Sequence, residues 1–167
     1  SNAVAPIYYN YGDNVTYQDG SVYYGDQVYA TQEQFADQSA QIAAAGLQAT
    51  PPPDDQWQSL GVFAMVQGDE TNSNDLFQLA LDANGTLRGN YYNAISDSTT
   101  PLSGSLDKTS QRLAWTLDGK KTPVYETGLY NVTQAETTML VHFGKDRTEQ
   151  YKLFRLEQPE NDSGTSP

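Results

Sequence analysis

Apolar and polar residues alternate along the chain from Trp57 to Gln158. This period of two is typical of strands with one buried face. Short polar connections, such as Ala83-Asn84-Gly85 and Lys145-Asp146-Arg147, separate the alternating runs. The pattern predicts eight strands, at Leu60–Val66, Leu76–Asp82, Thr86–Ile95, Pro101–Asp107, Arg112–Asp118, Val124–Val132, Thr138–Gly144 and Glu149–Glu157.

The connections between these strands set the predicted topology. Strands at intervals of about 8–12 residues, joined by hairpin turns, indicate an antiparallel sandwich or barrel. Short links favour a meander, and eight meandering strands avoid exposed edges by closing into a barrel. We therefore expect a mainly β protein with an eight-stranded antiparallel meander barrel. Its interior would be filled by side chains or hold one small ligand.

A different pattern precedes the barrel. Val15-Thr16-Tyr17 and Val22-Tyr23-Tyr24 flank Asp19-Gly20, which favours a type I′ hairpin. Thr31 and Gln34 then form a capping box for a helix that starts at Gln32. We expect this small β-hairpin plus one α-helix to precede the barrel in the chain.

The predicted helix runs to Ala45, and Gly46 is its expected C-terminal stop. Its apolar stripe is narrow, so a unit of this size is not expected to fold alone. We expect it to pack against the barrel or against a second copy of the chain. The stripe comprises Phe35, Ile42, Ala43 and Leu47, with the small residues Ala36, Ser39 and Ala40 beside it.

Composition shifts divide the chain into five segments. Residues 1–7 hold the remainder of an expression tag, Ser1-Asn2-Ala3, and a flexible start. Residues 8–47 form the tyrosine-rich hairpin and helix, and the proline-rich residues 48–56 form a linker. Residues 57–158 form the barrel domain, followed by a disordered polar tail at 159–167.

Charge and composition exclude several classes of protein. The 167-residue chain has a net charge of −12, which argues against a nucleic-acid binder. The absence of cysteine excludes disulfides and thiol catalysis. Every Lys and Arg lies at or beyond Arg88. The base-free first half would attract cations or a basic partner, or it is simply a solvated surface.

The barrel segment resembles the avidin family. Leu87-Arg88-Gly89-Asn90-Tyr91, Pro101–Asp107, Leu113–Thr116 and Thr127–Tyr130 follow one another as comparable segments do in those barrels. The resemblance implies an avidin-like or lipocalin-like barrel. It also implies that Tyr91 and Asn93 stand where avidins contact the ureido group of biotin. The stacking tryptophans of that family are replaced here by Phe63, Glu126 and Met139, so the resemblance implies the barrel without the biotin.

The whole chain is similar to bacterial cell-surface proteins described as mu-protocadherin-like. The segments that carry this resemblance are Ala30–Phe35, Leu60–Met65, Arg88–Asn93, Glu126–Asn131 and Val141–Gly144. It implies an exported, periplasmic or surface protein, with any export signal or membrane anchor lying outside this chain.

Few residues are candidates for chemistry. His142 is the only histidine, and Glu126 is the one acid that alternation could direct inward. If Glu126 shared a face with Tyr91, Trp115 and Tyr130, the barrel would have a polar and aromatic mouth. In the alternative register Tyr125 and Leu129 face the core and Glu126 faces water, and a period of two cannot choose between them.

These observations lead to two hypotheses for function. We favour a non-catalytic binding module that holds a small ligand, a glycan, a partner protein or a second copy of the chain. The binding surface is the barrel mouth or the tyrosine-rich face. The alternative is a small hydrolase that uses Glu126 or His142. We expect no cofactor, metal site or nucleic-acid partner. The expected binding residues are Tyr91, Asn93, Trp115, Glu126, Tyr130 and His142.

Overall fold

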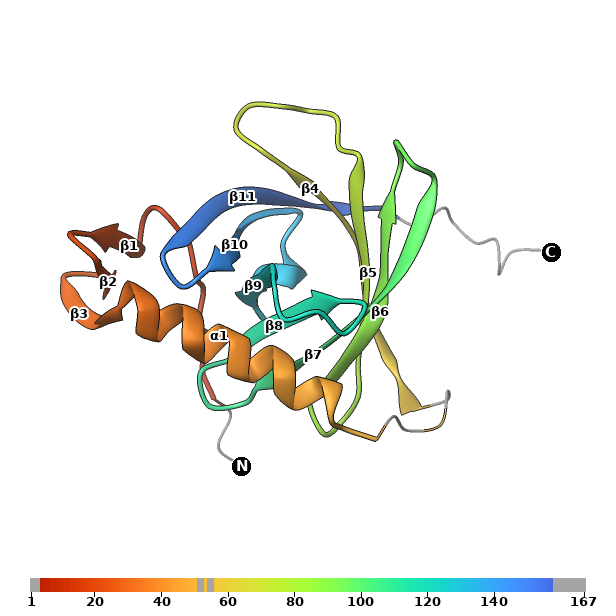
Figure 1. Ribbon diagram of the computed structural model, residues 1–167, viewed down its shortest axis with the longest axis horizontal. Helices are drawn as coiled ribbons and strands as arrows, with labels where there is room; N and C mark the ends of the chain where they lie inside the picture. Colours follow the sequence, from red (N-terminus) through yellow and green to blue (C-terminus); the bar gives the residue numbers. More distant parts are fainter. Residues whose placement is uncertain (1–3, 51–52, 54–55, 158–167) are drawn as a thin grey trace.

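The structure is a closed eight-stranded barrel with a helix and a small sheet packed on its outside (Figure 1). This computed structural model describes residues 4–50, 53 and 56–157. The predicted tag remainder at 1–3, residues 51, 52, 54 and 55 of the predicted linker and the predicted tail lie outside the described residues.

The barrel strands follow one another as a meander, as the sequence predicted, and β11 closes onto β4. Asp82 shapes the predicted turn at Asn84-Gly85, because its carboxylate accepts the backbone N–H groups of Asn84 and Thr86. The strands are β4 (Gln58–Val66), β5 (Asp75–Leu81), β6 (Thr86–Asn93), β7 (Ser98–Asp107), β8 (Arg112–Leu117), β9 (Val124–Gly128), β10 (Glu136–Gly144) and β11 (Arg147–Leu156).

The predicted strand Val124–Val132 is too long. It ends at Gly128 and is followed by a 3₁₀ turn, η2 (Asn131–Thr133). The N-terminal segment lies beside the end of β9. The Asn131 side chain accepts the Tyr9 N–H at 3.1 Å and donates to the Tyr9 carbonyl at 2.8 Å. These contacts hold the segment against the end of β9.

Side chains fill the barrel interior. Inward positions alternate along every strand and form one buried cluster, of which Trp115, Phe77 and Leu79 are completely inaccessible to solvent. At one end, η2 adds Val132 to this cluster, and the Arg155 guanidinium lies over the Phe63 ring and donates to the Leu60 carbonyl. The barrel interior is therefore plugged at the η2 end, and the hollow near Leu129 and Tyr130 lies outside this plug.

The N-terminal elements form a three-stranded antiparallel sheet and one helix. The sheet comprises β1 (Val15–Gln18), β2 (Ser21–Tyr24) and β3 (Gln27–Thr31). Asp19 and Gly20 adopt positive φ between β1 and β2, as the predicted type I′ turn requires. The helix α1 (Gln32–Leu47) begins with the predicted capping box of Thr31 and Gln34.

Helix α1 packs against the outer face of β7 and β8 (Figure 1). Two features of the predicted helix are wrong. Gly46 lies inside α1 and is buried, rather than ending the helix, and Leu47 is about half exposed rather than part of the buried stripe. The buried face is instead formed by Phe35 and small residues, which let the helix lie close to the barrel wall.

Candidate functional site

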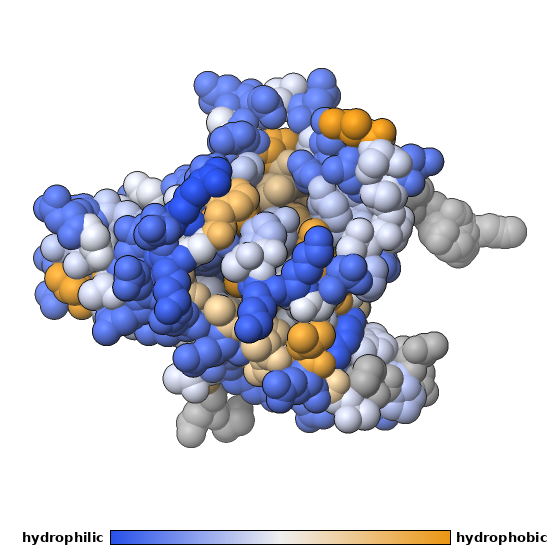
Figure 2. Space-filling view, viewed as in Figure 1, coloured by the Kyte–Doolittle hydropathy of each residue, from blue (hydrophilic) through white to orange (hydrophobic). Residues whose placement is uncertain are grey.

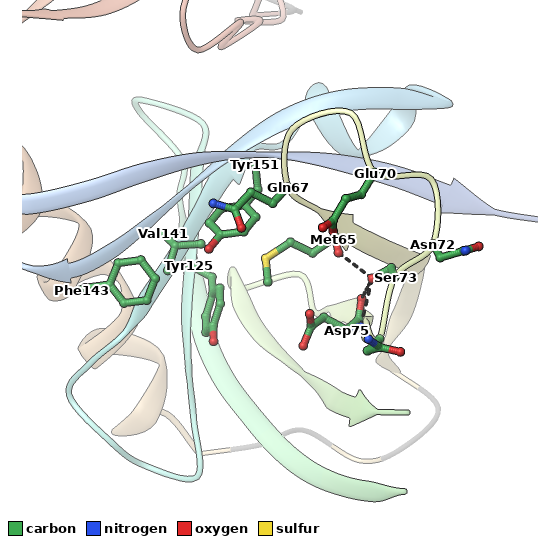
Figure 3. A pocket seen from close by; sticks show the side chains of 11 residues that line it. Met65, Gln67, Glu70, Asn72, Ser73, Asp75, Tyr125, Val141, Phe143 and Tyr151 are labelled. Atoms are coloured by element: carbon green, nitrogen blue, oxygen red, sulfur yellow. Dashed lines mark hydrogen bonds between the residues drawn. The ribbon is translucent and has the colours of Figure 1, made fainter. Parts of the chain in front are cut away.

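The end of the barrel opposite η2 carries a pocket of about 300 Å³. It lies beside the connection of residues 67–74 between β4 and β5, which is longer than the other barrel connections. Figure 3 shows its lining: Met65, Gln67, Glu70, Asn72, Ser73, Asn74, Asp75, Tyr125, Val141, Phe143 and Tyr151. We call this hollow the mouth pocket.

Ser73 fixes the rim of the mouth pocket. Its hydroxyl donates to the Met65 carbonyl at 2.5 Å and accepts the Asp75 N–H at 3.0 Å, so it ties the end of β4 to the start of β5 (Figure 3). This tie places Asp75 at the edge of the pocket. Figure 3 shows the Asp75 carboxylate and the Tyr125 ring on two sides of the Met65 thioether, with Glu70 on the loop.

A short relay of hydrogen bonds holds the Asp75 carboxylate. The Tyr91 hydroxyl donates to Asp75 Oδ1, and Asn93 Nδ2 donates to the Tyr91 oxygen at 3.1 Å. Burial, together with the neighbouring Asp75 carboxylate, raises the pKa of Tyr91 to about 12, so the phenol remains a donor. Tyr91 and Asn93, which the sequence singled out, thus support a lining residue of the pocket rather than line it themselves.

Tyr125 forms the inner wall of the mouth pocket. Its ring stacks on Trp115 at 6.1 Å between centroids and meets Phe77 edge-on, so it belongs to the barrel interior. Burial raises the pKa of Tyr125 to about 12. The sequence left the register of β9 open, and the structure has Tyr125 facing the core.

Glu126 therefore points out of the barrel, but it does not face water as the alternative register implied. Helix α1 covers it completely. Arg112 Nε lies 2.5 Å from Glu126 Oε2, and His142 Nε2 lies 2.8 Å from Glu126 Oε1. The Ser39 hydroxyl of α1 donates to the same carboxylate. These four residues form what we call the buried polar cluster.

The geometry of the buried polar cluster differs from that of a hydrolytic relay. In a Ser–His–acid relay the serine and the acid bind different nitrogens of the imidazole. Here Ser39 Oγ and Glu126 Oε1 both approach His142 Nε2, at 3.2 and 2.8 Å, while Nδ1 meets the Thr148 hydroxyl. Ser39, Glu126 and His142 are all buried, so a substrate could reach them only if α1 moved away.

The six residues predicted for binding thus lie in four different places. Tyr91 and Asn93 lie behind the mouth pocket, and Trp115 lies in the filled interior. Glu126 and His142 belong to the buried polar cluster. Tyr130 precedes η2 at the plugged end of the barrel, where it is partly exposed. The structure does not bring them together as one polar and aromatic mouth.

Most residues of the pocket lining were not among the predicted binding residues. Glu70 and Ser73 lie in the connection of residues 67–74, and Asp75 follows it directly. The length and polarity of this connection were the signal available in the sequence. The tyrosine-rich face is also smaller than expected, because Tyr9 and Tyr11 are buried and Tyr17 and Tyr24 pack against the same core. Plain packing accounts for most of those tyrosines.

Neither a metal-binding cluster nor a membrane-spanning helix occurs among the described residues. No group of three or more His, Asp or Glu residues there is placed to hold a metal ion. No helix in this part of the chain is both long and apolar enough to cross a membrane. Comparisons with family models, curated proteins and solved structures give no match to the chain.

Proposed function

We propose that this chain is a non-catalytic binding module whose ligand site is the mouth pocket. One observation carries the proposal: a hollow of about 300 Å³ opens at one end of a barrel that is otherwise filled and plugged. Ligand sites are typically concave, with apolar and aromatic walls and a few convergent polar groups. Tyr125, Val141 and Met65 supply the walls, and Asp75 and Ser73 supply polar groups.

The arrangement of the mouth supports binding over display of a flat surface. Asp75 is held by Tyr91 and by the Ser73 tie before any ligand arrives. A preorganised polar group costs less conformational entropy on binding than a mobile one. The tyrosine-rich face lacks this arrangement, because its rings are largely packed against Phe35 and Val22.

The buried polar cluster gives less support to the hydrolase alternative. Glu126 and His142 do have second polar groups within about 3 Å, as that alternative requires. They lie under α1 rather than in an open pocket. Their contacts join the helix to β8, β9 and β10, which is a structural role.

Following the resemblance to surface proteins, we also propose that the module acts after export or at the cell surface.

The proposal can be tested by titrating the full chain with a small-molecule fragment collection that contains cationic, neutral and anionic members. Nuclear magnetic resonance of backbone amides should show shifts that gather around Asp75, Tyr125 and Tyr151. Gln67 is exposed on the pocket rim, so Gln67→Trp should cover the mouth and weaken binding at least tenfold.

Gln58→Trp is the matched control for this experiment. Gln58 is equally exposed but begins β4 at the far end of the same strand, so the substitution should leave binding unchanged. Shifts that gather elsewhere, or a fragment collection with no binder at millimolar concentration, would refute the proposed site.

A further inference from the structure

The mouth pocket is lined by negative charge without a compensating base. Glu70 and Asp75 are among its lining residues, which include no Lys, Arg or His. Within the described residues neither carboxylate takes part in an ion pair. The nearby Arg147 is already paired with Glu149 at 2.9 Å. An anionic ligand would therefore meet repulsion, and a cation would meet attraction.

The other walls of the pocket are aromatic. Tyr125, Phe143 and Tyr151 line it, and the faces of such rings attract cations. One of these rings already interacts with a cation, since the Arg147 guanidinium lies 4.3 Å from the centroid of Phe143. Arg147 is exposed and is not itself a lining residue.

Tyr125 adds an independent indication of a ligand. The residue is 8% exposed and lines the pocket, and its hydroxyl has no hydrogen-bond partner in the described part of the chain. A hydroxyl without a protein partner in a pocket wall is free to donate to a ligand that bears a hydroxyl or carbonyl oxygen. Tyr125 and Asp75 thus offer a donor and an anionic acceptor to the same small volume.

We infer that the mouth pocket binds a small organic cation, an alkylammonium compound with a hydroxyl or carbonyl oxygen. This inference rests on the proposed function and specifies its ligand class. The ammonium group would lie between the Asp75 carboxylate and the aromatic walls, and the ligand oxygen would accept from Tyr125. A volume near 300 Å³ is at the low end of small-molecule sites and fits one such molecule. The net charge of −12 would raise the local concentration of cations around the protein.

The test compares two probes of nearly identical shape. Choline carries a quaternary nitrogen where 3,3-dimethylbutan-1-ol carries a neutral carbon, and both have the same hydroxyl. The full chain is titrated with each probe, and binding is measured by calorimetry and by amide chemical shifts. At low salt, choline should bind at least tenfold more tightly than 3,3-dimethylbutan-1-ol. The preference should shrink as salt is added, because screening weakens the attraction of the carboxylates. Acetate should not bind.

Substitutions then separate charge from shape. Asp75→Asn keeps the size of the side chain and should weaken choline binding about tenfold, while binding of 3,3-dimethylbutan-1-ol stays the same. A variant that had merely lost its fold would lose both probes. Glu70→Gln should weaken choline less, because Glu70 lies on an exposed loop. Its control is Asp69→Asn, an exposed acid of the same loop that does not line the pocket.

The outcomes distinguish the two proposals. Equal affinity for choline and its neutral analogue at the mouth would overturn the cation inference and leave the binding site standing. Binding of anionic or neutral fragments at the mouth, without choline, would have the same meaning. Absence of any binder at the mouth would refute both proposals.

Discussion

Gly46 and Gly104 meet where α1 crosses β7. A Cβ atom on Gly46 would lie 1.6 Å from the carbonyl oxygen of Gly104, far inside any real contact. Beside this crossing, the Ser105 hydroxyl donates to the Ile42 carbonyl of the helix. The sequence identified Gly46 only as a helix stop. A glycine that ends a helix and one that permits a close approach look alike until the partner strand is known.

Gly46→Ala is expected to destabilise the protein. In an isolated helix this change stabilises by about 0.5–1 kcal/mol, because glycine is a poor helix former. Here the new methyl group would meet backbone atoms of β7, and such overpacking costs roughly 1–3 kcal/mol. The midpoint of urea unfolding should therefore fall.

Gln41→Ala, at an exposed position of the same helix, is the control and should leave the midpoint nearly unchanged. A Gly46→Ala protein as stable as the original would mean that α1 does not lie this close to β7.

Glu126 shows what single-residue reasoning could and could not achieve. The alternation of apolar and polar residues identified Glu126 as a candidate inward-facing acid, but it could not determine which face of the strand this residue occupies. Its partner Ser39 lies 87 positions away in the chain, on an element that the sequence could place only as packed on the barrel or on a second copy. The site residues Asp75 and Tyr125 were missed for the same reason, since the pocket forms only when distant strands close.

At the level of elements, the buried polar cluster is the main polar connection between α1 and the barrel. Arg112 Nη1 donates to Gln38 at 2.6 Å, and its guanidinium lies 4.0 Å from the centroid of Phe35, both on the helix. Burial alone would raise the pKa of Glu126. The charge of Arg112 and the hydrogen bonds from His142 and Arg112 outweigh this effect and hold that pKa at about 2, below its ordinary 4.5.

Acid is therefore expected to weaken the docking of α1. A carboxyl whose pKa is lowered by folding contributes stability above its unfolded pKa, and this contribution is lost as the pH falls toward the folded value. For Glu126 the loss should occur between about pH 4.5 and pH 2. Urea midpoints measured at pH 6, 4 and 3 would follow it.

The comparison protein is the double variant Arg112→Met with Glu126→Met. Replacing both partners of a buried pair by apolar residues is often close to neutral, whereas removing one costs about 3–5 kcal/mol. The original protein and the double variant have all other carboxylates in common. The variant should therefore lose less stability than the original protein on acidification. The same pH dependence in both proteins would contradict the assigned role of Glu126.

Strands were the elements most accessible to sequence analysis. Their alternation is local, and the predicted β5–β6 hairpin pairs as expected from Leu81↔Leu87 to Asp75↔Asn93. The errors arise where distant segments compete for the same place. β9 ends early because the Tyr9 backbone donates one hydrogen bond to Asn131 and accepts another from it, and no local pattern near residue 128 carries that information.

At the scale of the whole molecule, the N-terminal elements share a core with the barrel wall. Leu140 of β10 is buried in the same cluster as Val22 of β2 and Phe35 of α1. Figure 2 shows that the face turned to the viewer is mostly hydrophilic, with apolar side chains in small separate areas. Much of the apolar surface of residues 8–47 is thus covered by the barrel of the same chain, although Val28 and Leu47 stay exposed, and this explains how so few aliphatic residues suffice. The chain is expected to unfold as one cooperative unit.

Phe35→Ala tests this coupling. Phe35 is completely buried, with the rings of Tyr17, Tyr24 and Tyr29 edge-on around it and Arg112 over its face. Loss of such a ring costs roughly 3–5 kcal/mol. In a Trp57→Phe background, fluorescence reports Trp115 alone, deep in the barrel interior.

If the molecule is one cooperative unit, Phe35→Ala will move the Trp115 unfolding transition to lower urea by the same amount as the transition seen by far-ultraviolet circular dichroism. Ile95→Ala, at a position 79% exposed on the connection between β6 and β7, should move neither. A Trp115 transition that stays in place while helical signal is lost earlier would mean that the barrel is stable without α1. The buried polar cluster would then open to solvent while the barrel remains folded, and the hydrolase alternative would regain access to Glu126 and His142.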